Sequence, residues 1–313
     1  MMEAQPNRVV YGKTITELGA LDENIVVLDA DISKSTNTFQ FAKRFPERFF
    51  NIGVAEQNMI GIAAGLATTG FIPFASTFAI FLSLRASEQI RTSVAYPRLN
   101  VKIVATSAGV EIGMDGVTHQ AVEDLAVMRS IANMVVMSPS DPVSTKKAVE
   151  AIYRYNGPVY MRLGRNASNV IHSEDTEFTI GKMIRLREGK DITLIATGHM
   201  VEQALIASDF LKTKGINARV VDCHTIKPID TAEIVSAAEE TAGIVTAEDH
   251  NVIGGLGGAV CEVTADFSPT IVKRVGLNDK FAQSARDYKK LLAFYHIDAL
   301  EIIKKAEEIL RRK

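Results

Sequence analysis

The sequence predicts an α/β fold made of two doubly wound domains. At 313 residues the chain exceeds the size that one hydrophobic core usually serves. Short apolar runs alternate with longer segments of helical period, which is typical of a mainly parallel sheet covered by helices on both faces. A polar stretch without clear periodicity, residues 165–182, interrupts this alternation. We therefore expect a first domain over residues 1–170, a linker over 171–188 and a second, smaller domain over 189–313.

The first domain is expected to alternate strands and helices in order along the chain. Its predicted strands, each apolar enough to be buried on both faces, are 25–30, 71–76, 101–106, 134–138 and 159–162. Its predicted helices are 8–20, 54–69, 79–95, 119–131 and 142–155. In such sheets ligands bind outside the carboxyl ends of the strands, so polar residues that directly follow a strand are candidate site residues.

The second domain repeats the same alternation. Its predicted strands are 192–197, 218–223, 243–247 and 270–275, and its predicted helices are 200–214, 231–241 and one from about 254. The final stretch places Leu300, Ile303, Ala306 and Leu310 at helical spacing. We expect it to close the chain as an amphipathic helix.

Composition excludes several classes of protein. Lys plus Arg (35) nearly balances Asp plus Glu (37), so neither nucleic acid nor an anionic membrane is an expected partner. The N-terminus lacks a secretory leader and no apolar run reaches membrane-spanning length, from which we expect a cytoplasmic protein. Cys223 and Cys261 are expected to be buried free thiols. The histidine spacing indicates no metal site in this chain.

Two stretches after predicted strands have a structural and a functional interpretation. In GMDGVTHQ, Thr118 either caps the helix expected after it, with His119 and Asp115 facing solvent, or His119 and Asp115 face a ligand. In STFAIF, Phe78 and Phe81 lie on one helix face, either as core residues or as a shelf for a flat heterocycle.

Two further stretches concern anion binding. In DADISKS, the serines and the following threonine either cap a helix or bind an anion at its start. The glycine-rich IGGLGGAV, residues 253–260, has neither dinucleotide-fold nor P-loop spacing, so close helix packing is its better interpretation.

Glu56 opens a helix of small and apolar residues in NIGVAEQNMIGIAAGLATTG. A glutamate in a first turn is favourable beside the helix dipole. The continuation MIGIAAGLATTG suits close packing on every side of the helix, and a carboxylate at the start of a buried helix is costly unless it is paired or protonated. Glu56 therefore needs a partner.

With these residues in view, the chain resembles the thiamine-diphosphate enzyme family of transketolases. GVAEQNM resembles the segment that carries the family's glutamate, and DADISKS, STFAIF, MDGVTHQAVEDLAVMRS, SPSDPVSTKKAVE and LGRN follow in the family's order. The resemblance continues through TIKPID and AEDHNVIGGLGGAV and covers essentially the whole chain. It implies a pyrimidine-binding domain followed by a transketolase C-terminal domain.

The resemblance implies roles for single residues. Glu56 would hydrogen-bond a ring nitrogen of the cofactor's aminopyrimidine, as a protonated carboxyl that donates, and His119 would contact the sugar near its reacting carbonyl. The other implied cofactor residues are Phe81, Phe78, Asp31 and Ile32, and the other implied substrate residues are Asp115, Arg8, Ser35 and Arg165. Leu84 and Ser107 depart from the family pattern, where a tyrosine and a phosphate-binding histidine are common.

The family's motif for Mg²⁺ and diphosphate, a GDG followed by an asparagine, is not found in this chain. Its Asp-Gly pair, Asp115-Gly116, already belongs to the THQ stretch. The resemblance therefore implies a split enzyme: this chain is the C-terminal subunit, an N-terminal subunit supplies the Mg²⁺ and diphosphate domain, and homodimerisation gives a heterotetramer. Such an enzyme transfers a ketol unit from a ketose phosphate to an aldose phosphate.

Three rival interpretations stay open at this point. The THQ and SPSD stretches also resemble 1-deoxyxylulose-5-phosphate synthase, of which this chain would be a fragment. The length and separateness of the chain also suit the β subunit of a 2-oxoacid dehydrogenase, although MDGVTHQAVEDLA matches that family less well. The third is a non-catalytic scaffold, against which the joint presence of Glu56, Asp115 and His119 argues.

Overall fold

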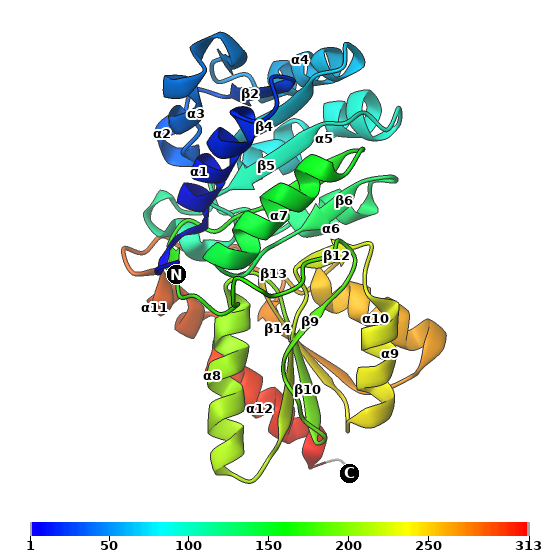
Figure 1. The fold of residues 1–313 in the computed structure, drawn as a ribbon. Coiled ribbons are helices and arrows are strands. Elements are labelled where there is room, and N and C mark those ends of the chain that lie inside the picture. The colour runs from blue at the N-terminus through cyan, green and yellow to red at the C-terminus, as the bar shows by residue number, and fades with distance from the viewer. Residues whose placement is uncertain (1, 312–313) are drawn as a thin grey trace.

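The computed structural model describes residues 2–311, which form two α/β domains stacked end to end, the N-terminal domain at the top of Figure 1. Both sheets are mainly parallel with helices on both faces, so the predicted fold class is confirmed. Residues 1 and 312–313 of the expected domains lie outside the described residues. Over the described range, no helix combines the length and apolar character needed to cross a bilayer.

The first domain is built on a seven-stranded sheet. Its strands in spatial order are β12 (Thr225–Lys227), β6 (Val135–Met137), β7 (Val159–Arg162), β5 (Lys102–Thr106), β4 (Ile72–Phe78), β2 (Ile25–Asp29) and β3 (Phe49–Asn51). All neighbours are parallel except β12 and β6. The five predicted strands are all present, and β3 is an additional edge strand that the sequence did not reveal.

Helices cover both faces of this sheet. One face is packed by α1 (Asn7–Gly19), α3 (Phe39–Arg44) and α7 (Pro142–Arg154), whose buried residues share a core with the strands. The other face is packed by α4 (Glu56–Thr68) and α6 (Asp124–Ser130). Two short helices follow in the chain between these: α2 (Ser33–Thr36) comes before α3, and α5 (Ser87–Gln89) comes before α6. The N-terminus of α7 follows the local sequence, because Asp141 and Ser144 form a capping box and Pro142 occupies the first turn.

Two predicted helices differ from the structure. The helix expected over 79–95 is interrupted by a bend at Ala86 and contains π-helical segments at Phe81–Arg85 and Ile90–Ala95. Hydrogen bonds spanning five residues, such as Ala86 N–H to the Phe81 carbonyl at 3.1 Å, replace the α-helical pattern there. The helix expected over 119–131 begins only at Asp124.

The turn before α6 also corrects the prediction for Thr118. This residue does not cap a helix, because residues 116–120 form a turn that begins at Gly116 with φ of 71°. This positive φ favours glycine, and a Cβ atom at Gly116 would also crowd Ser284 Oγ.

The second domain is a five-stranded sheet. Its strands in spatial order are β14 (Val272–Leu277), β13 (Ile244–Asn251), β10 (Ile192–Ala196), β11 (Ala218–Asp222) and β9 (Ile184–Arg187). Strand β9 pairs antiparallel with β11, so part of the expected linker over 171–188 is a strand of the second sheet. The helices are α8 (Met200–Thr213), α9 (Thr231–Glu240), α10 (Leu256–Phe267), α11 (Tyr288–Phe294) and α12 (Ala299–Leu310).

Helix α12 is the amphipathic helix expected at the end of the chain. Its buried side chains include Ile302, Ile303, Ala306 and Ile309. Leu300, expected on the apolar face, is instead 72% exposed.

The structure also shows the surroundings of the two cysteines and of the glycine-rich stretch 253–260. Cys223 is buried as expected, and burial raises the pKa of its thiol, whereas Cys261 is only half-buried. The glycines at 257 and 258 lie within α10, and a Cβ at Gly257 would crowd Arg274 and Thr246, in line with the expected close packing.

The two domains share strands and core. Strand β12 follows β11 of the second domain but adds to β6 of the first, as Figure 1 shows at the junction. One apolar cluster contains Leu125 and Val136 from the first domain together with Ile226 and Leu256 from the second. Lys227 anchors the junction by donating to the carbonyl of Arg129 at 2.9 Å.

A buried histidine also joins the domains. His172 Nδ1 lies 3.1 Å from an oxygen of Asp141, at the start of α7, and Nε2 lies 3.2 Å from an oxygen of Asp222, at the end of β11. Burial alone would lower the pKa of His172, but the two carboxylates outweigh it and raise the pKa to about 9. A charged His172 therefore holds two buried carboxylates of different domains together.

This arrangement makes the contribution of His172 to stability depend on pH. Because its folded pKa is raised from 6.5 to about 9, the stabilisation is complete below pH 6.5 and is lost as the pH rises through about 9. Its size is at most about 3 kcal/mol. Burial lowers the pKa of Lys102 to about 7, so the contribution of Lys102 to stability increases with pH, opposite to that of His172. The test therefore compares a His172 variant with the wild type at each pH, because Lys102 is the same in both.

We expect the free energy of unfolding of His172→Gln to lie well below that of the wild type at pH 6.5, with the gap narrowing towards pH 10. Urea denaturation across this pH range measures both. The exposed His296 provides the control, since His296→Gln should follow the wild type at every pH. A gap for His172→Gln that stayed constant with pH would contradict the assignment.

Candidate functional site

A carboxylate and three rings from separate parts of the first domain define the main candidate site. Glu56 is the first residue of α4, Phe78 ends β4, and Phe81 begins the π-helical segment that follows. The His119 ring lies 5.3 Å from the Phe81 ring and 6.0 Å from the Phe78 ring, both edge to face. The Phe78 and Phe81 rings are 6.2 Å apart. Phe78 therefore ends a strand and does not share with Phe81 the helix face that the sequence predicted, but the three rings still form one cluster of contacts.

Glu56 has a partner within the chain. Its side chain is only 2% exposed, and Arg85 Nη1 donates to Glu56 Oε2 at 2.8 Å. The Arg85 guanidinium also lies over the Phe81 ring, 4.5 Å from its centroid. This pairing offsets part of the cost of burying the carboxylate.

The surroundings of α4 differ from the expectation of packing on every side. Gly61 and Gly65 have no neighbouring atom within 4 Å of a Cβ position. Ile62 is 36% exposed and Val54, just before the helix, is 71% exposed. Only the face of α4 that carries Met59, Ile60 and Ala63 is buried. Glu56 therefore lies beside an open surface, on which Gln57 and Asn58 are exposed together with the apolar residues.

A second group of predicted residues is basic. Strand β1 (Gln5–Pro6) pairs with β8 (Ala167–Ser168), which brings Arg8 next to Arg165. Arg8 donates to the Arg165 carbonyl at 3.3 Å and to the Ser35 carbonyl at 2.7 Å. Arg165 Nη1 donates to Asp115 Oδ2 at 2.7 Å. The structure thus brings together four of the five residues for which the resemblance implied substrate contacts, and the loop of Asp115 carries the fifth, His119.

The charges of this group favour an anion. Burial and the nearby charge of Arg165 lower the pKa of Arg8 from its usual value. The ion pair with Asp115 is about 40% exposed on both sides, so solvent screens it. A phosphate between the two guanidinium groups would relieve their repulsion and accept hydrogen bonds from both.

Asp31 and Ile32 lie at the carboxyl end of β2, where the topology of the sheet predicts ligand contacts. Asp31 has φ of 67°, and Asn51 donates to its side chain at 2.8 Å. The neighbouring loop is held by the buried Asp29, which accepts from the Ile32 amide at 2.7 Å. Burial raises the pKa of Asp29, while hydrogen bonds from Thr36 and Thr38 oppose the rise.

Arg85 and Asp29 are the residues of this region that sequence reasoning missed. Asp29 carries a detectable signal, because it is an acid at the end of an otherwise apolar strand. Arg85 carries a weaker one, since only the π-helical path of the chain turns it towards Glu56. Of the two departures from the family pattern, Leu84 is 51% exposed and Ser107 is buried with φ of 58°.

The site suits part of the expected cofactor. A buried carboxylate beside an aromatic surface fits a planar aminopyrimidine. Among residues 2–311, no three acidic, histidine or cysteine side chains gather as a metal ion would require.

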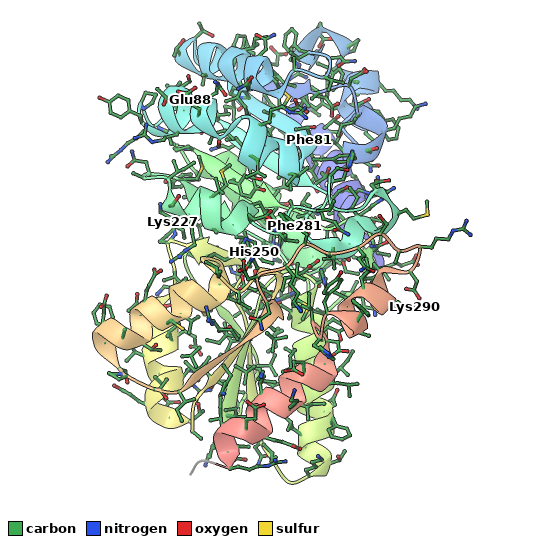
Figure 2. The ribbon with its side chains drawn as sticks, turned by 180° about the vertical axis from the view of Figure 1, so that it is seen from behind. Phe81, Glu88, Lys227, His250, Phe281 and Lys290 are labelled. Carbon is green, nitrogen blue, oxygen red and sulfur yellow. The ribbon has the colours of Figure 1, made fainter. Side chains whose placement is uncertain are left out.

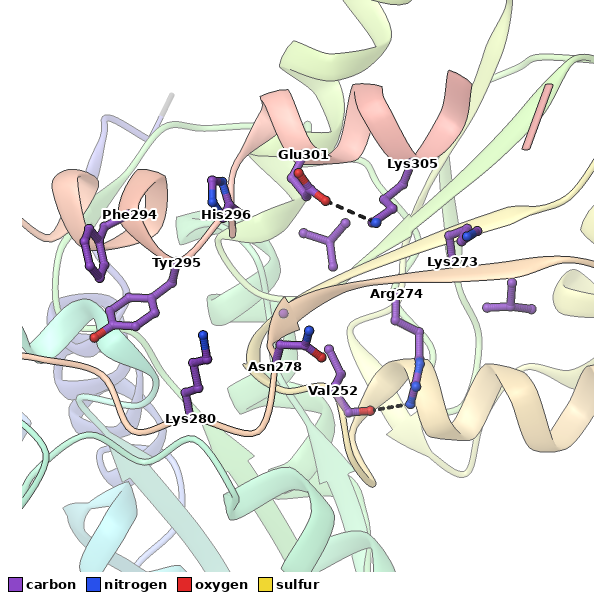
Figure 3. Close-up of a pocket in the computed structure, with 13 residues that line it drawn as sticks. Val252, Lys273, Arg274, Asn278, Lys280, Phe294, Tyr295, His296, Glu301 and Lys305 are labelled. Atoms are coloured by element: carbon purple, nitrogen blue, oxygen red, sulfur yellow. Dashed lines mark hydrogen bonds and ion pairs between the residues drawn. The ribbon is translucent and has the colours of Figure 1, made fainter. Parts of the chain in front are cut away.

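A basic cavity lies apart from this site. It has a volume of about 530 Å³ and opens between β14 and α12 in the second domain (Figure 3). Its charged lining includes Lys273, Arg274, Lys280 and Lys305, of which Lys305 pairs with Glu301 at 3.2 Å. None of the predicted site residues lines it. In Figure 2 Phe81 lies within the first domain, whereas His250 lies near the junction.

The two domains match two known families. Residues 3–170 match the family described as transketolase, pyrimidine binding domain, and residues 181–302 match transketolase, C-terminal domain. The second match begins before β9, in agreement with the pairing of that strand.

Similar proteins share the full extent of the chain. It is 52% identical over 306 residues to a putative transketolase C-terminal section of Methanocaldococcus jannaschii, covering 97% of this chain and 96% of the relative. It is 42% identical to the 6-deoxy-6-sulfo-D-fructose transketolase subunit of a Clostridium species, covering 98% and 95%. A solved structure described as a split gene transketolase, inactive beta4 tetramer, superposes with a TM-score of 0.90 at 48% identity, covering 99% of both chains.

The chain has both transketolase domains in the expected order, and its relatives have the same extent. It therefore belongs to the transketolase family and corresponds to the C-terminal subunit of its split members.

Proposed function

We propose that the chain is the C-terminal subunit of a two-chain transketolase that moves a two-carbon ketol unit from a ketose phosphate to an aldose phosphate. The observation that carries this proposal is the buried Glu56 beside the rings of Phe81, Phe78 and His119. The relatives are named as parts of transketolases, which favours this function over a deoxyxylulose-phosphate synthase fragment, a 2-oxoacid dehydrogenase subunit or a scaffold.

The cofactor is thiamine diphosphate, which when bound supplies a nucleophilic carbon that no side chain can offer. Glu56 holds a ring nitrogen of its pyrimidine, and Phe81 with Phe78 stacks on the ring. Asp31 and Ile32 line the same end of the sheet. His119 orients the sugar near its reacting carbonyl, and its contact with Thr118 Oγ1 at 2.9 Å helps to fix the imidazole.

Asp115 and the two arginines select the sugar. Arg8 and Arg165, with Ser35, hold the terminal anion, and Asp115 reads a nearby hydroxyl. One relative is named for a sulfonated sugar, and a guanidinium pair can donate hydrogen bonds to a sulfonate as well as to a phosphate. A panel of phosphorylated and sulfonated ketoses distinguishes the two substrate classes.

An N-terminal subunit supplies the domain that holds Mg²⁺ and the diphosphate, and two copies of each subunit form a heterotetramer. Two apolar side chains on the open surface at the start of α4 support a neighbouring chain beside Glu56: Val54, just before the helix, is 71% exposed and Ile62, on the helix, is 36% exposed. A similar solved structure is described as an inactive tetramer of the β chain.

The purified chain is expected to transfer no ketol units with thiamine diphosphate and Mg²⁺ alone. Addition of the N-terminal subunit should produce activity that saturates at a fixed subunit ratio, because each site needs groups from both chains. A coupled assay with a ketose phosphate donor and an aldose phosphate acceptor measures the rate. Transfer by the purified chain without a partner would refute the two-chain proposal.

A further inference from the structure

Arg85 contacts both parts of the surface that the proposed function gives to the cofactor. Its Nη1 donates to Glu56 Oε2 at 2.8 Å, and its guanidinium lies 4.5 Å from the centroid of the Phe81 ring. A guanidinium is planar, carries N–H donors at its edge and stacks on aromatic faces. An aminopyrimidine is also planar, presents nitrogens at its edge and stacks in the same way.

The guanidinium of Arg85 and an aminopyrimidine cannot make these contacts at the same time. A ring stacked on Phe81 with its edge towards Glu56 needs the space and the carboxyl oxygen that Arg85 uses here. The role of Glu56 also needs a carboxyl that donates a hydrogen bond to a ring nitrogen. A carboxylate paired with a guanidinium only accepts hydrogen bonds.

We propose that Arg85 competes with the cofactor's pyrimidine for Glu56 and Phe81 and must withdraw when the cofactor binds. This inference rests on the proposed function, because it assumes that thiamine diphosphate is the ligand of Glu56. It assigns to Arg85 the role of a placeholder, which keeps the buried carboxylate paired and the aromatic face covered.

The position of Arg85 allows this movement. Its side chain is 47% exposed although its partner Glu56 is 2% exposed, so the guanidinium enters from solvent. It ends the π-helical segment Phe81–Arg85, directly before the bend at Ala86. No other hydrogen bond or ion pair holds its side chain within the part of the chain that the structure describes. Withdrawal therefore breaks one half-exposed ion pair and one ring contact.

The departure at Leu84 agrees with this arrangement. The family pattern implied a further aromatic against the pyrimidine at this position, and Leu84 instead points to solvent with 51% of its surface exposed. In this chain the group next to Phe81 and Glu56 is therefore the neighbouring Arg85.

The test compares Arg85→Gln with the wild type in the assembled two-subunit enzyme. Calorimetric titration with thiamine diphosphate at fixed Mg²⁺ gives the dissociation constant without reference to turnover. Arg85→Gln removes the half-exposed ion pair that competes with the cofactor, so thiamine diphosphate should bind about three- to tenfold more tightly. Arg91→Gln is the matched control, because Arg91 is exposed on the same helical stretch and its side chain has no described partner. Its dissociation constant should equal that of the wild type.

Arg85→Lys provides a second variant if the glutamine variant does not assemble. Lysine keeps the charge but cannot lie flat on Phe81, so its dissociation constant should fall between those of the wild type and Arg85→Gln. Binding by the Arg85 variants that is equal to or weaker than the wild type would overturn the placeholder role. Failure of the wild-type complex to bind thiamine diphosphate would instead refute the proposed function.

Discussion

Replacement of Glu56 by glutamine is expected to lower kcat of the assembled enzyme by about two to four orders of magnitude, the usual range for a lost proton-transfer group. Glutamine matches the size of the side chain but cannot exchange a proton with a ring nitrogen. The coupled ketol-transfer assay at saturating cofactor and Mg²⁺ measures the loss.

The control for this variant is Glu88→Gln. Glu88 is an exposed glutamate on the short helix α5, where it accepts a hydrogen bond from Gln89. Its replacement should leave kcat unchanged. Far-ultraviolet circular dichroism and the midpoint of unfolding should show Glu56→Gln folded, since only the pairing with Arg85 is lost. A kcat within a factor of a few of the wild type would exclude the role given to Glu56.

The largest effect on stability is expected from Asp124→Ala. Asp124 is fully buried and accepts from Arg162 Nε at 2.9 Å and from the Tyr160 hydroxyl at 2.8 Å. Arg162 also donates to the backbone carbonyl of Asp249 in the second domain at 2.9 Å. Burial, together with the negative charge of Asp124, raises the pKa of Tyr160 well above its usual value.

Loss of the carboxylate leaves Arg162 buried without its ion-pair partner. The expected decrease in the free energy of unfolding is about 3–5 kcal/mol. Urea denaturation measures it, and Asp209→Ala is the control because the pair of Asp209 with Arg187 is exposed and is worth at most about 1 kcal/mol. Equal losses for the two variants would show that the Asp124 pair contributes no more than a surface pair.

The elements that the sequence predicted correctly have local causes. Helix α7 follows its capping box at Asp141 and Ser144, and the parallel strands follow continuous apolar runs. The closeness of Phe78, Phe81 and His119 agrees with the topology, because Phe78 ends β4, Phe81 follows it, and the loop of His119 follows the adjacent parallel strand β5.

The elements that it missed depend on distant contacts or on hydrogen-bond register. The π-helical segments at 81–85 and 90–95 have ordinary helix-forming residues, so composition does not separate them from an α-helix. The late start of α6 depends on glycines in the preceding loop, and β12 depends on an edge supplied by β6. The partner of Glu56 was missed for the same reason, since Arg85 is 29 residues away along the chain.

Because strand β12 belongs to the sheet of the first domain, this sheet is completed only after part of the second domain has been synthesised. Residues 225–227 leave the ribosome after the β10 and β11 strands of the second domain, yet they finish the sheet of the first. Until then, β6 presents an open edge of unpaired backbone groups, which is a template for pairing with another chain. The second domain thus protects the first from misassociation, because an N-terminal fragment cut between the domains would lack β12 and leave the edge of β6 open.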